Sequence, residues 1–265
     1  MLKDTVTQAT DVLRIKDHGR VRVLTLNRPA ALNAFNDTLY QAFTQALSDA
    51  AAQRDIAVVL VTGEGRAFSA GQDLAELSDG RSHQQRQVDG FGPFIQALEG
   101  FPKPLIAAVN GLGIGIGLTM LPHCDLVFVS EAARLRAPFA ALGLTAEAGS
   151  SFLLPQRMGW QAAAHALFSA RWLDADEAVR TGLAYRKVAA ADLMDQALGV
   201  AAEIAAMPVA SLVATKQLLL DARVPSSRAA RAREDVAFGP LVGGPANLEA
   251  VAAFGERRPP DFSGL

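Results

Sequence analysis

Apolar and polar positions divide the first half of the chain into short strands. The run 21–29 alternates apolar with polar residues and leaves the predicted sheet at Arg28-Pro29, whereas 56–63, 104–111 and 125–130 are almost continuously apolar and are closed by glycine or polar residues. Continuous apolar runs are typical of strands that are covered on both faces, so these three predict the centre of a layered sheet.

Helical spacing fills the gaps between these strands. Leu39 recurs with apolar residues four and eight positions later, behind Asn36 or Asp37 as the N-cap, and the segment 94–98 predicts a second helix before Pro102. Strands that alternate with helices indicate an α/β fold with a mostly parallel sheet. From about residue 155 the chain becomes rich in alanine and leucine at helical spacing, so we expect a helical C-terminal part, interrupted by the short run 184–188.

Composition narrows the class of protein. The chain has 265 residues, half of them apolar, and a net charge of −2, which gives no indication of a nucleic-acid partner. The single cysteine, Cys124, excludes an intramolecular disulfide and a multi-cysteine zinc site, and it fits core packing better than a nucleophile. The N-terminus has no apolar signal region and no apolar run is long enough to span a membrane, so we expect a cytoplasmic protein without a metal site.

The segment 110–125, NGLGIGIGLTMLPHCD, has glycine at four alternate positions. It lacks the spacing of a dinucleotide loop and the lysine of a phosphate loop, but its backbone N–H groups could donate to a developing oxyanion. The segment 63–74, GEGRAFSAGQDL, follows its own strand in the same way, and parallel strands would bring both loops to one edge of the sheet. The alternatives are ordinary strand-to-helix turns, with Asp73 as a helix N-cap.

Ordered motifs make the chain resemble the crotonase, or enoyl-CoA hydratase/isomerase, superfamily: LNRPAALNAF, AFSAGQDL, PLIAAVNGLGIGIG, HCDLVFVS and ATKQLLL. The resemblance covers nearly the whole sequence and implies an α/β fold, a spiral of repeated β-β-α units with a helical C-terminal trimerisation region. It also implies a core over residues 1–200 that contains the acyl-CoA site, an oligomerisation region over 201–265, and homotrimers or dimers of trimers.

The resemblance assigns two oxyanion donors. They are the backbone N–H groups of Gln72 and Ile116, which would bind the thioester oxygen of an acyl-CoA. It also places residues of the two loops and of the turn before the first helix along the substrate and its CoA: Ala30, Leu32, Ala67, Ala70, Gly71, Asp73, Leu74 and Gly115. Arg257 or Arg258 could meet a phosphate of CoA, although a solvent-exposed ion pair is the simpler interpretation for them.

The carboxylates depart from the hydratase pattern. The two hydratase glutamates align with Thr119 and Phe139, neither of which can transfer a proton as a carboxylate does. Glu147, in the segment ALGLTAEAGSSFLLP, resembles the single catalytic glutamate of the Δ3,Δ2-enoyl-CoA isomerase branch. We expect its apolar neighbours to raise its pKa towards neutrality. The alternative is an exposed carboxylate at a helix start, stabilised by the helix dipole.

One carboxylate fits a shift of a double bond from C3 to C2 of an enoyl-CoA through a dienolate, with Glu147 as proton shuttle. The runner-up functions are a low-activity enoyl-CoA hydratase and a non-catalytic acyl-CoA-binding protein. The lack of a dinucleotide fingerprint disfavours redox chemistry. The predicted reaction therefore requires no dissociable cofactor, because coenzyme A is part of the substrate.

Overall fold

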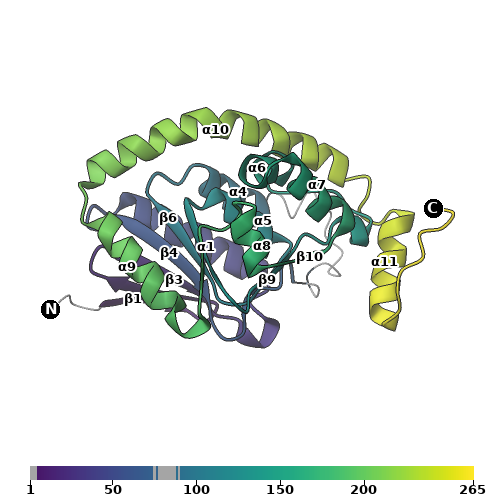
Figure 1. Ribbon diagram of the computed structural model, residues 1–265, viewed down its shortest axis with the longest axis horizontal. Helices are drawn as coiled ribbons and strands as arrows, with labels where there is room; N and C mark the ends of the chain where they lie inside the picture. Colours follow the sequence, from purple (N-terminus) through teal and green to yellow (C-terminus); the bar gives the residue numbers. More distant parts are fainter. Residues whose placement is uncertain (1–4, 74–75, 77–87, 89) are drawn as a thin grey trace.

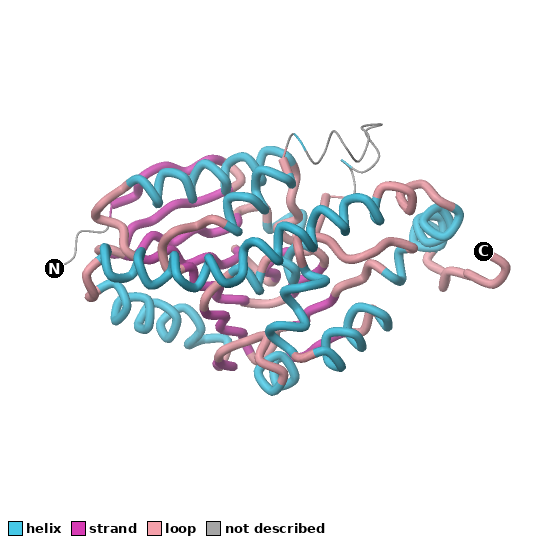
Figure 2. Tube along the Cα trace, turned by 90° about the horizontal axis from the view of Figure 1, so that it is seen from above, coloured by secondary structure: helices cyan, strands magenta, loops and turns pink. Residues whose placement is uncertain are grey.

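The computed structural model describes residues 5–73, 76, 88 and 90–265. Two sheets form the centre of the molecule, and helices cover them on both sides (Figures 1 and 2). The long helix α10 (Val209–Phe238) arches over the top of Figure 1, α9 (Leu193–Ala205) lies below its N-terminal half, and α11 (Pro245–Glu256) projects at the right. Leu74, one of the predicted substrate-binding residues, lies outside the described residues.

The larger sheet has seven strands within the described residues, in the order β1-β2-β3-β4-β6-β8-β11. Their bounds are β1 Thr5–Thr10, β2 Leu13–His18, β3 Val21–Leu26, β4 Val58–Gly63, β6 Leu105–Val109, β8 Leu126–Ser130 and β11 Arg186–Val188. From β3 to β11 every pair is parallel, while β1, β2 and β3 pair antiparallel. The mostly parallel sheet expected from the alternation of strands and helices is therefore confirmed.

A smaller sheet of four strands carries the second strand of each repeated unit. Its order is β10-β9-β7-β5, with β5 Ala67–Ser69, β7 Leu112–Ile114, β9 Arg134–Arg136 and β10 Trp172–Asp174. The chain runs from β4 to β5, from β6 to β7 and from β8 to β9. The first strands of these pairs, β4, β6 and β8, are neighbours in the large sheet, and the second strands, β5, β7 and β9, are neighbours in the small sheet. The chain therefore winds as the spiral of repeated units that the sequence predicts, and the β4–β5 and β6–β7 connections meet at one edge.

Alternate residues of the central strands enter two separate cores. Val59 and Val61 of β4 pack with the aromatic side chains of α1 (Asp37–Ala52) and α4 (Phe91–Glu99), whereas Val58 and Leu60 pack with apolar residues of α9 on the opposite face. All four valine and leucine side chains are fully buried. Continuous apolar runs thus correspond to strands covered on both faces, as predicted, because each face needs its own apolar residues.

Four more α-helices and four 3-10 helices complete the described part of the chain. They are α5 Ile116–Thr119, α6 Ser150–Met158, α7 Trp160–Ser169 and α8 Ala175–Arg180, with 3-10 helices at Pro29–Ala31, Leu121–His123, Ala140–Leu142 and Ala190–Asp192. Helix α1 begins after Asn36, whose side chain accepts the Leu39 N–H as an N-cap. The prediction of this helix start is confirmed.

The C-terminal region differs in detail from the sequence prediction. The expected helical part is present, and its longest helix, α10, continues through Pro225 to Phe238, so the missing N–H of that proline does not end the helix. The proposed division at residue 200 falls inside α9, which packs on the large sheet, and the division into core and oligomerisation regions stays a prediction. No single described helix could cross a membrane; one bent pair, 190–205 with 209–238, would suffice by length and composition alone.

A buried asparagine joins the turn after β3 to the first loop. Asn33 has a φ of 56°, its Oδ1 accepts the Arg28 N–H at 2.8 Å, and its Nδ2 donates to the carbonyl oxygens of Glu64 and Ala67 at 2.9 and 2.8 Å. Asparagine tolerates this left-handed conformation better than most residues do. The side chain therefore fixes the distance between the 27–36 turn and the loop that follows β4.

Replacing Asn33 by alanine should lower the free energy of unfolding by about 2–4 kcal/mol, because three hydrogen bonds of a buried side chain are lost and alanine tolerates the left-handed φ less well. Urea denaturation followed by circular dichroism measures this change. Asn27→Ala, which removes a single bond to the Asp11 carbonyl, is the matched control and should cost about 1 kcal/mol or less. Equal losses in both variants would show that Asn33 does not have this joining role.

Candidate active site between two glycine loops

The first loop leaves a backbone donor unused. Phe35 and Gln72 form an isolated parallel bridge, in which Phe35 N–H donates to the Gly71 carbonyl at 2.7 Å and Asp73 N–H donates to the Phe35 carbonyl at 2.9 Å. Such a bridge uses the groups on either side of Gln72, so the N–H of Gln72 itself points away from Phe35. Among the described residues this N–H has no hydrogen-bond acceptor.

The second loop presents a similar group at the start of α5. Gly115 has a φ of 53° and a ψ of −120°, a conformation that residues with a Cβ avoid, and its carbonyl accepts both Leu118 N–H and Thr119 N–H at 2.9 Å. The N–H of Ile116 is in the first turn of this helix, where no intrahelical acceptor exists. It too has no acceptor within the described part of the chain.

The two loops touch through their backbones. A Cβ placed on Gly71, which has a φ of 97°, would lie 2.9 Å from the Ile114 carbonyl oxygen. A Cβ placed on Gly117 would lie 2.6 Å from the Ser69 carbonyl oxygen. Glycine is therefore required where the strands β5 and β7 deliver the loops, and the structure brings the predicted donors Gln72 and Ile116 together on neighbouring segments.

Glu147 lies beside the far end of α5. It precedes α6, and its pKa is raised to about 8, first by burial and then by the negative charge of Glu234. The hydroxyl of Thr119 is close enough to the Glu147 carboxylate to lower this pKa in part, although it makes no hydrogen bond of full geometry among the described residues. Thr119 is one helical turn after Ile116, so the carboxyl group lies next to the second loop.

This environment does not fit the alternative interpretation of Glu147. The residue is half-buried rather than exposed, and a helix dipole alone would lower the pKa of a carboxyl group rather than raise it. Two apolar residues that precede Glu147 in the same segment belong to or pack against the main core: Phe139 and Leu144. A carboxyl group held in such a place is a candidate for proton transfer near neutral pH.

Glu234 is a neighbour that sequence analysis missed. It comes from α10, 87 positions after Glu147, and its carboxylate accepts the N–H groups of Gly149 and Ser151 at 2.6 and 2.7 Å. These bonds satisfy backbone donors at the start of α6, and burial raises the pKa of Glu234 as well. The contact forms because α10 packs on α6 in the folded chain. No local sequence pattern links the two segments, so sequence analysis could not predict it.

Arg28 positions the first loop through an ion pair. Its Nη2 lies 2.7 Å from Oδ2 of Asp73, and its Nη1 reaches the Ala34 carbonyl. Asp73 was predicted to contact substrate or to cap a helix. In the structure its carboxylate contacts Arg28. Most of the residues that would follow it in a helix lie outside the described part of the chain. The ion pair closes the loop against the 27–36 turn.

The other predicted substrate residues cluster along the same turn. Ala70 N–H donates to the Leu32 carbonyl at 2.9 Å, which joins the first loop to the turn, and Ala30 is exposed at the turn surface. Ala67, by contrast, is fully buried in β5. Its carbonyl accepts the side chain of Asn33, so Ala67 is part of the packed interior and its role at the substrate stays a prediction.

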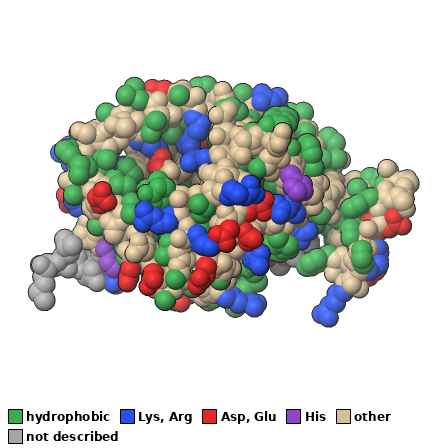
Figure 3. Space-filling model, in the orientation of Figure 1, with side chains coloured by type: hydrophobic (Ala, Val, Ile, Leu, Met, Phe, Trp, Pro, Cys, Tyr) green, Lys and Arg blue, Asp and Glu red, His purple; other side chains and the backbone are tan. Residues whose placement is uncertain are grey.

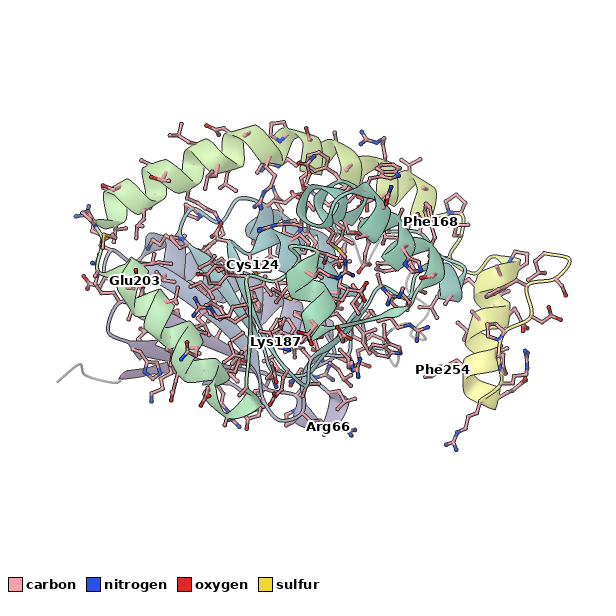
Figure 4. The ribbon with its side chains drawn as sticks, in the orientation of Figure 1. Arg66, Cys124, Phe168, Lys187, Glu203 and Phe254 are labelled. Atoms are coloured by element: carbon pink, nitrogen blue, oxygen red, sulfur yellow. The ribbon has the colours of Figure 1, made fainter. Side chains whose placement is uncertain are left out.

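Cys124 and His123 are core residues. Figure 4 shows Cys124 in the interior of the molecule; burial raises the pKa of its thiol to about 12, and burial lowers the pKa of His123 to about 3. Neither is suited to nucleophilic or acid–base work near neutral pH. Arg258 pairs with Glu249 and Glu256, as the ion-pair interpretation expects. Among the described residues no group of His, Cys, Asp and Glu side chains could hold a metal ion.

Two touching loops, each with a backbone N–H that has no acceptor among the described residues, and a nearby carboxyl group of raised pKa form a candidate site for stabilising an enolate-type oxyanion and moving a proton beside it. The model of the family described as enoyl-CoA hydratase/isomerase matches residues 16–264. The chain belongs to this family, and the fold is the crotonase fold.

Relatives and a solved structure agree with the family over most of their length. The 2,3-dehydroadipyl-CoA hydratase of Escherichia coli K12 is 35% identical over 95% of this chain and 98% of its own. The 1,2-epoxyphenylacetyl-CoA isomerase of the same organism is 31% identical, with 92% and 95% covered. An enoyl-CoA hydratase/isomerase structure from Pseudoalteromonas atlantica superposes with a TM-score of 0.90 at 36% identity, covering 95% of this chain and 100% of that one.

The carboxyl group of Glu147 should lower the free energy of unfolding at alkaline pH. The free carboxyl has a pKa of 4.5 and the folded one about 8, so between these values the folded state holds a proton that the unfolded state has released. Stability of the wild type therefore falls as the pH rises through this window. Glu147→Gln should be more stable by about 1–3 kcal/mol above pH 8 and nearly equal below pH 4.5, measured by urea denaturation at each pH.

Glu249→Gln provides a control of opposite sign. Arg258 lowers the pKa of Glu249 to about 2, so that carboxylate stabilises the folded state above pH 4.5 and its removal should destabilise the protein there. If the free energy of unfolding of Glu147→Gln falls with rising pH as steeply as that of the wild type, Glu147 is not the cause of the fall, and its carboxyl is not held in a desolvated, acidic environment.

Proposed function

We propose that this protein is a Δ3,Δ2-enoyl-CoA isomerase, which moves a double bond from C3 to C2 of an acyl-CoA. The observation that carries the proposal is the position of Glu147, whose carboxyl group has a raised pKa and lies beside α5, where the first N–H is a candidate oxyanion donor. A reaction that needs one proton carrier and an oxyanion hole fits this site, and family membership supports an acyl-CoA substrate.

The chemistry requires that one base serve twice. Ionised Glu147 removes a proton from C2, and the electron pair moves onto the thioester oxygen to give a dienolate, which the N–H groups of Gln72 and Ile116 stabilise. The protonated Glu147 then returns a proton at C4, and the electrons settle as a C2–C3 double bond. No atom is gained or lost, and the carboxylate is regenerated.

Hydration is the second candidate, because several relatives carry the name hydratase, among them the 2,3-dehydroadipyl-CoA hydratase of Escherichia coli K12. Addition of water needs a base for the water and an acid for the α-carbon. The hydratase carboxylates align with Thr119 and Phe139, so this chain would have to perform both steps with Glu147 alone. We therefore expect hydration of a 2-enoyl-CoA to be slow relative to isomerisation of a 3-enoyl-CoA.

Conversion of 3-enoyl-CoA to 2-enoyl-CoA, followed by the absorbance of the conjugated thioester, tests the proposal. Because the base must be ionised, kcat/KM should rise with pH through about 8 and then level off. Glu147→Gln should lower kcat by about 10²–10⁴-fold. Glu203→Gln, on the exposed face of α9, is the matched control and should keep full activity (Figure 4).

Three results would overturn the proposal in different ways. Unchanged isomerisation by Glu147→Gln would remove this residue from the mechanism. Hydration of 2-enoyl-CoA that is faster than isomerisation would favour the hydratase, while tight binding of acyl-CoA without turnover of either substrate would favour a non-catalytic binding protein.

We further propose that the protein assembles as a homotrimer, or as a dimer of trimers, through its C-terminal helices. Apolar side chains of α11 are 59–69% exposed at helical spacing: Leu248, Val251 and Phe254. Figure 3 shows apolar atoms at the surface of the projecting α11, and Figure 4 shows Phe254 on that helix. Such a patch on a helix that stands away from the body is suited to burial against another copy.

Light scattering after gel filtration tests this assembly. The wild type should have three or six times the chain mass of 27.9 kDa, and the double substitution Val251→Asp and Phe254→Asp should shift it towards the monomer, because charges would be buried at the contact. Phe254→Leu keeps an apolar side chain and should preserve the assembly. A monomeric wild type at micromolar concentration contradicts the proposal.

A further inference from the structure

Tyr40 makes a contact to the oxyanion loop that the mechanism above does not use. It lies in the first turn of α1, its side chain is 1% exposed, and its hydroxyl donates to Oε1 of Gln72 at 2.9 Å. A buried phenol normally finds one polar partner, and here the partner is the side chain of a candidate oxyanion residue.

The ring of Tyr40 is held by its aromatic neighbours. Its centroid lies 4.9 Å from that of Phe35 and 5.2 Å from that of Phe94, and it meets Phe91 edge-on at 5.9 Å. Phe35 is also the bridge partner of Gln72. The phenol thus has little freedom to move. It is linked to Gln72 twice, directly through its hydroxyl and indirectly through its ring contact with Phe35.

Two constraints act on Gln72 from one side. The bridge to Phe35 holds its neighbours Gly71 and Asp73 through backbone hydrogen bonds, and Tyr40 holds its carboxamide. Rotation of the Gln72 backbone would have to break the contact to Tyr40 as well as the bridge. The direction of the Gln72 N–H, on which an oxyanion hole depends, is therefore restricted by a side-chain contact.

We infer that Tyr40 is a positioning residue of the oxyanion hole, which orients the backbone N–H of Gln72 by holding the Gln72 side chain. The inference rests on the proposed function of Gln72 as an oxyanion donor. It goes beyond that function, because it assigns the preorganisation of this donor to a particular hydroxyl on α1. Tyr40 acts through Gln72 and transfers no proton to the substrate, since its hydroxyl proton is already donated to Oε1.

The burial and the acidic surroundings of the phenol keep it in its donor form. Desolvation raises the pKa of Tyr40 well above its usual value, and the carboxylates of Glu147, Glu76 and Asp37 raise it further. The proposed base Glu147 therefore lies within electrostatic range of the Tyr40 hydroxyl.

Tyr40→Phe tests the inference because it keeps the ring and removes only the hydroxyl. We expect kcat for isomerisation to fall about 3–30-fold with KM changed less than twofold, since full loss of an oxyanion donor costs about 10²–10³-fold and a misdirected donor costs less. The carbonyl stretch of a bound, ¹³C-labelled 2-enoyl-CoA should move towards its value in free solution. Tyr185→Phe, which removes an exposed hydroxyl from the chain's other tyrosine, should change neither quantity.

A double-mutant cycle with Gln72→Ala distinguishes positioning from direct action. Gln72→Ala keeps the backbone N–H but removes the side chain that Tyr40 holds, so adding Tyr40→Phe to it should lower kcat by less than twofold. An additional tenfold loss would show that Tyr40 acts on the substrate directly. Gln72→Ala alone should reproduce the loss in kcat and the carbonyl shift, which gives a second test should Tyr40→Phe fold poorly.

The wild-type protein separates failure of the inference from failure of the proposed function. A wild type that isomerises 3-enoyl-CoA and shifts the carbonyl stretch, with Tyr40→Phe unchanged in both, overturns the role of Tyr40 alone. A wild type that neither isomerises the substrate nor shifts the carbonyl stretch overturns the oxyanion hole itself.

Discussion

Close backbone contact between two glycine loops is the constraint on which the site depends. Gly71 and Gly117 occupy places where a Cβ would collide with carbonyl oxygens of the neighbouring strand or loop. This contact puts Gln72 and Ile116 on adjacent segments, where neither N–H has an acceptor among the residues that the structure describes. Because β5 and β7 are parallel neighbours, the loops that follow them leave the sheet at the same edge. The fold itself therefore places the two candidate donors side by side.

Strands, central helices and loops could be predicted from local patterns, because burial on two faces leaves a continuous apolar run and glycine marks tight contacts. Val58 to Val61 are an example: neighbouring residues face opposite cores, so the periodicity that distinguishes a half-exposed strand is missing and the run itself is the signal. The length of α10 could not be predicted, since Pro225 is a helix breaker by propensity and only packing over α4 and α6 holds the helix through it.

The candidate site likewise contains residues that the sequence indicated and residues that only the folded structure identifies. The family resemblance indicated Gln72 and Ile116, which lie on the two loops that touch, and Glu147, which lies beside the end of α5. The residues that support them come from distant elements and carry no local signal: Tyr40 from α1, Arg28 from the end of β3 and Glu234 from α10. Single-sequence patterns report periodicity and turn chemistry, whereas side-chain contacts across the fold require the coordinates.

Glu234 also joins the C-terminal helix to the chemistry. Its carboxylate caps α6 and raises the pKa of Glu147, so the helix that carries it cannot be treated as an accessory to the core. The ionisation of the proposed base depends on how α10 packs, because a shift of that helix would move a charge towards or away from Glu147. Since α10 leads directly into the proposed assembly helix α11, contacts between copies would influence the base through the same carboxylate.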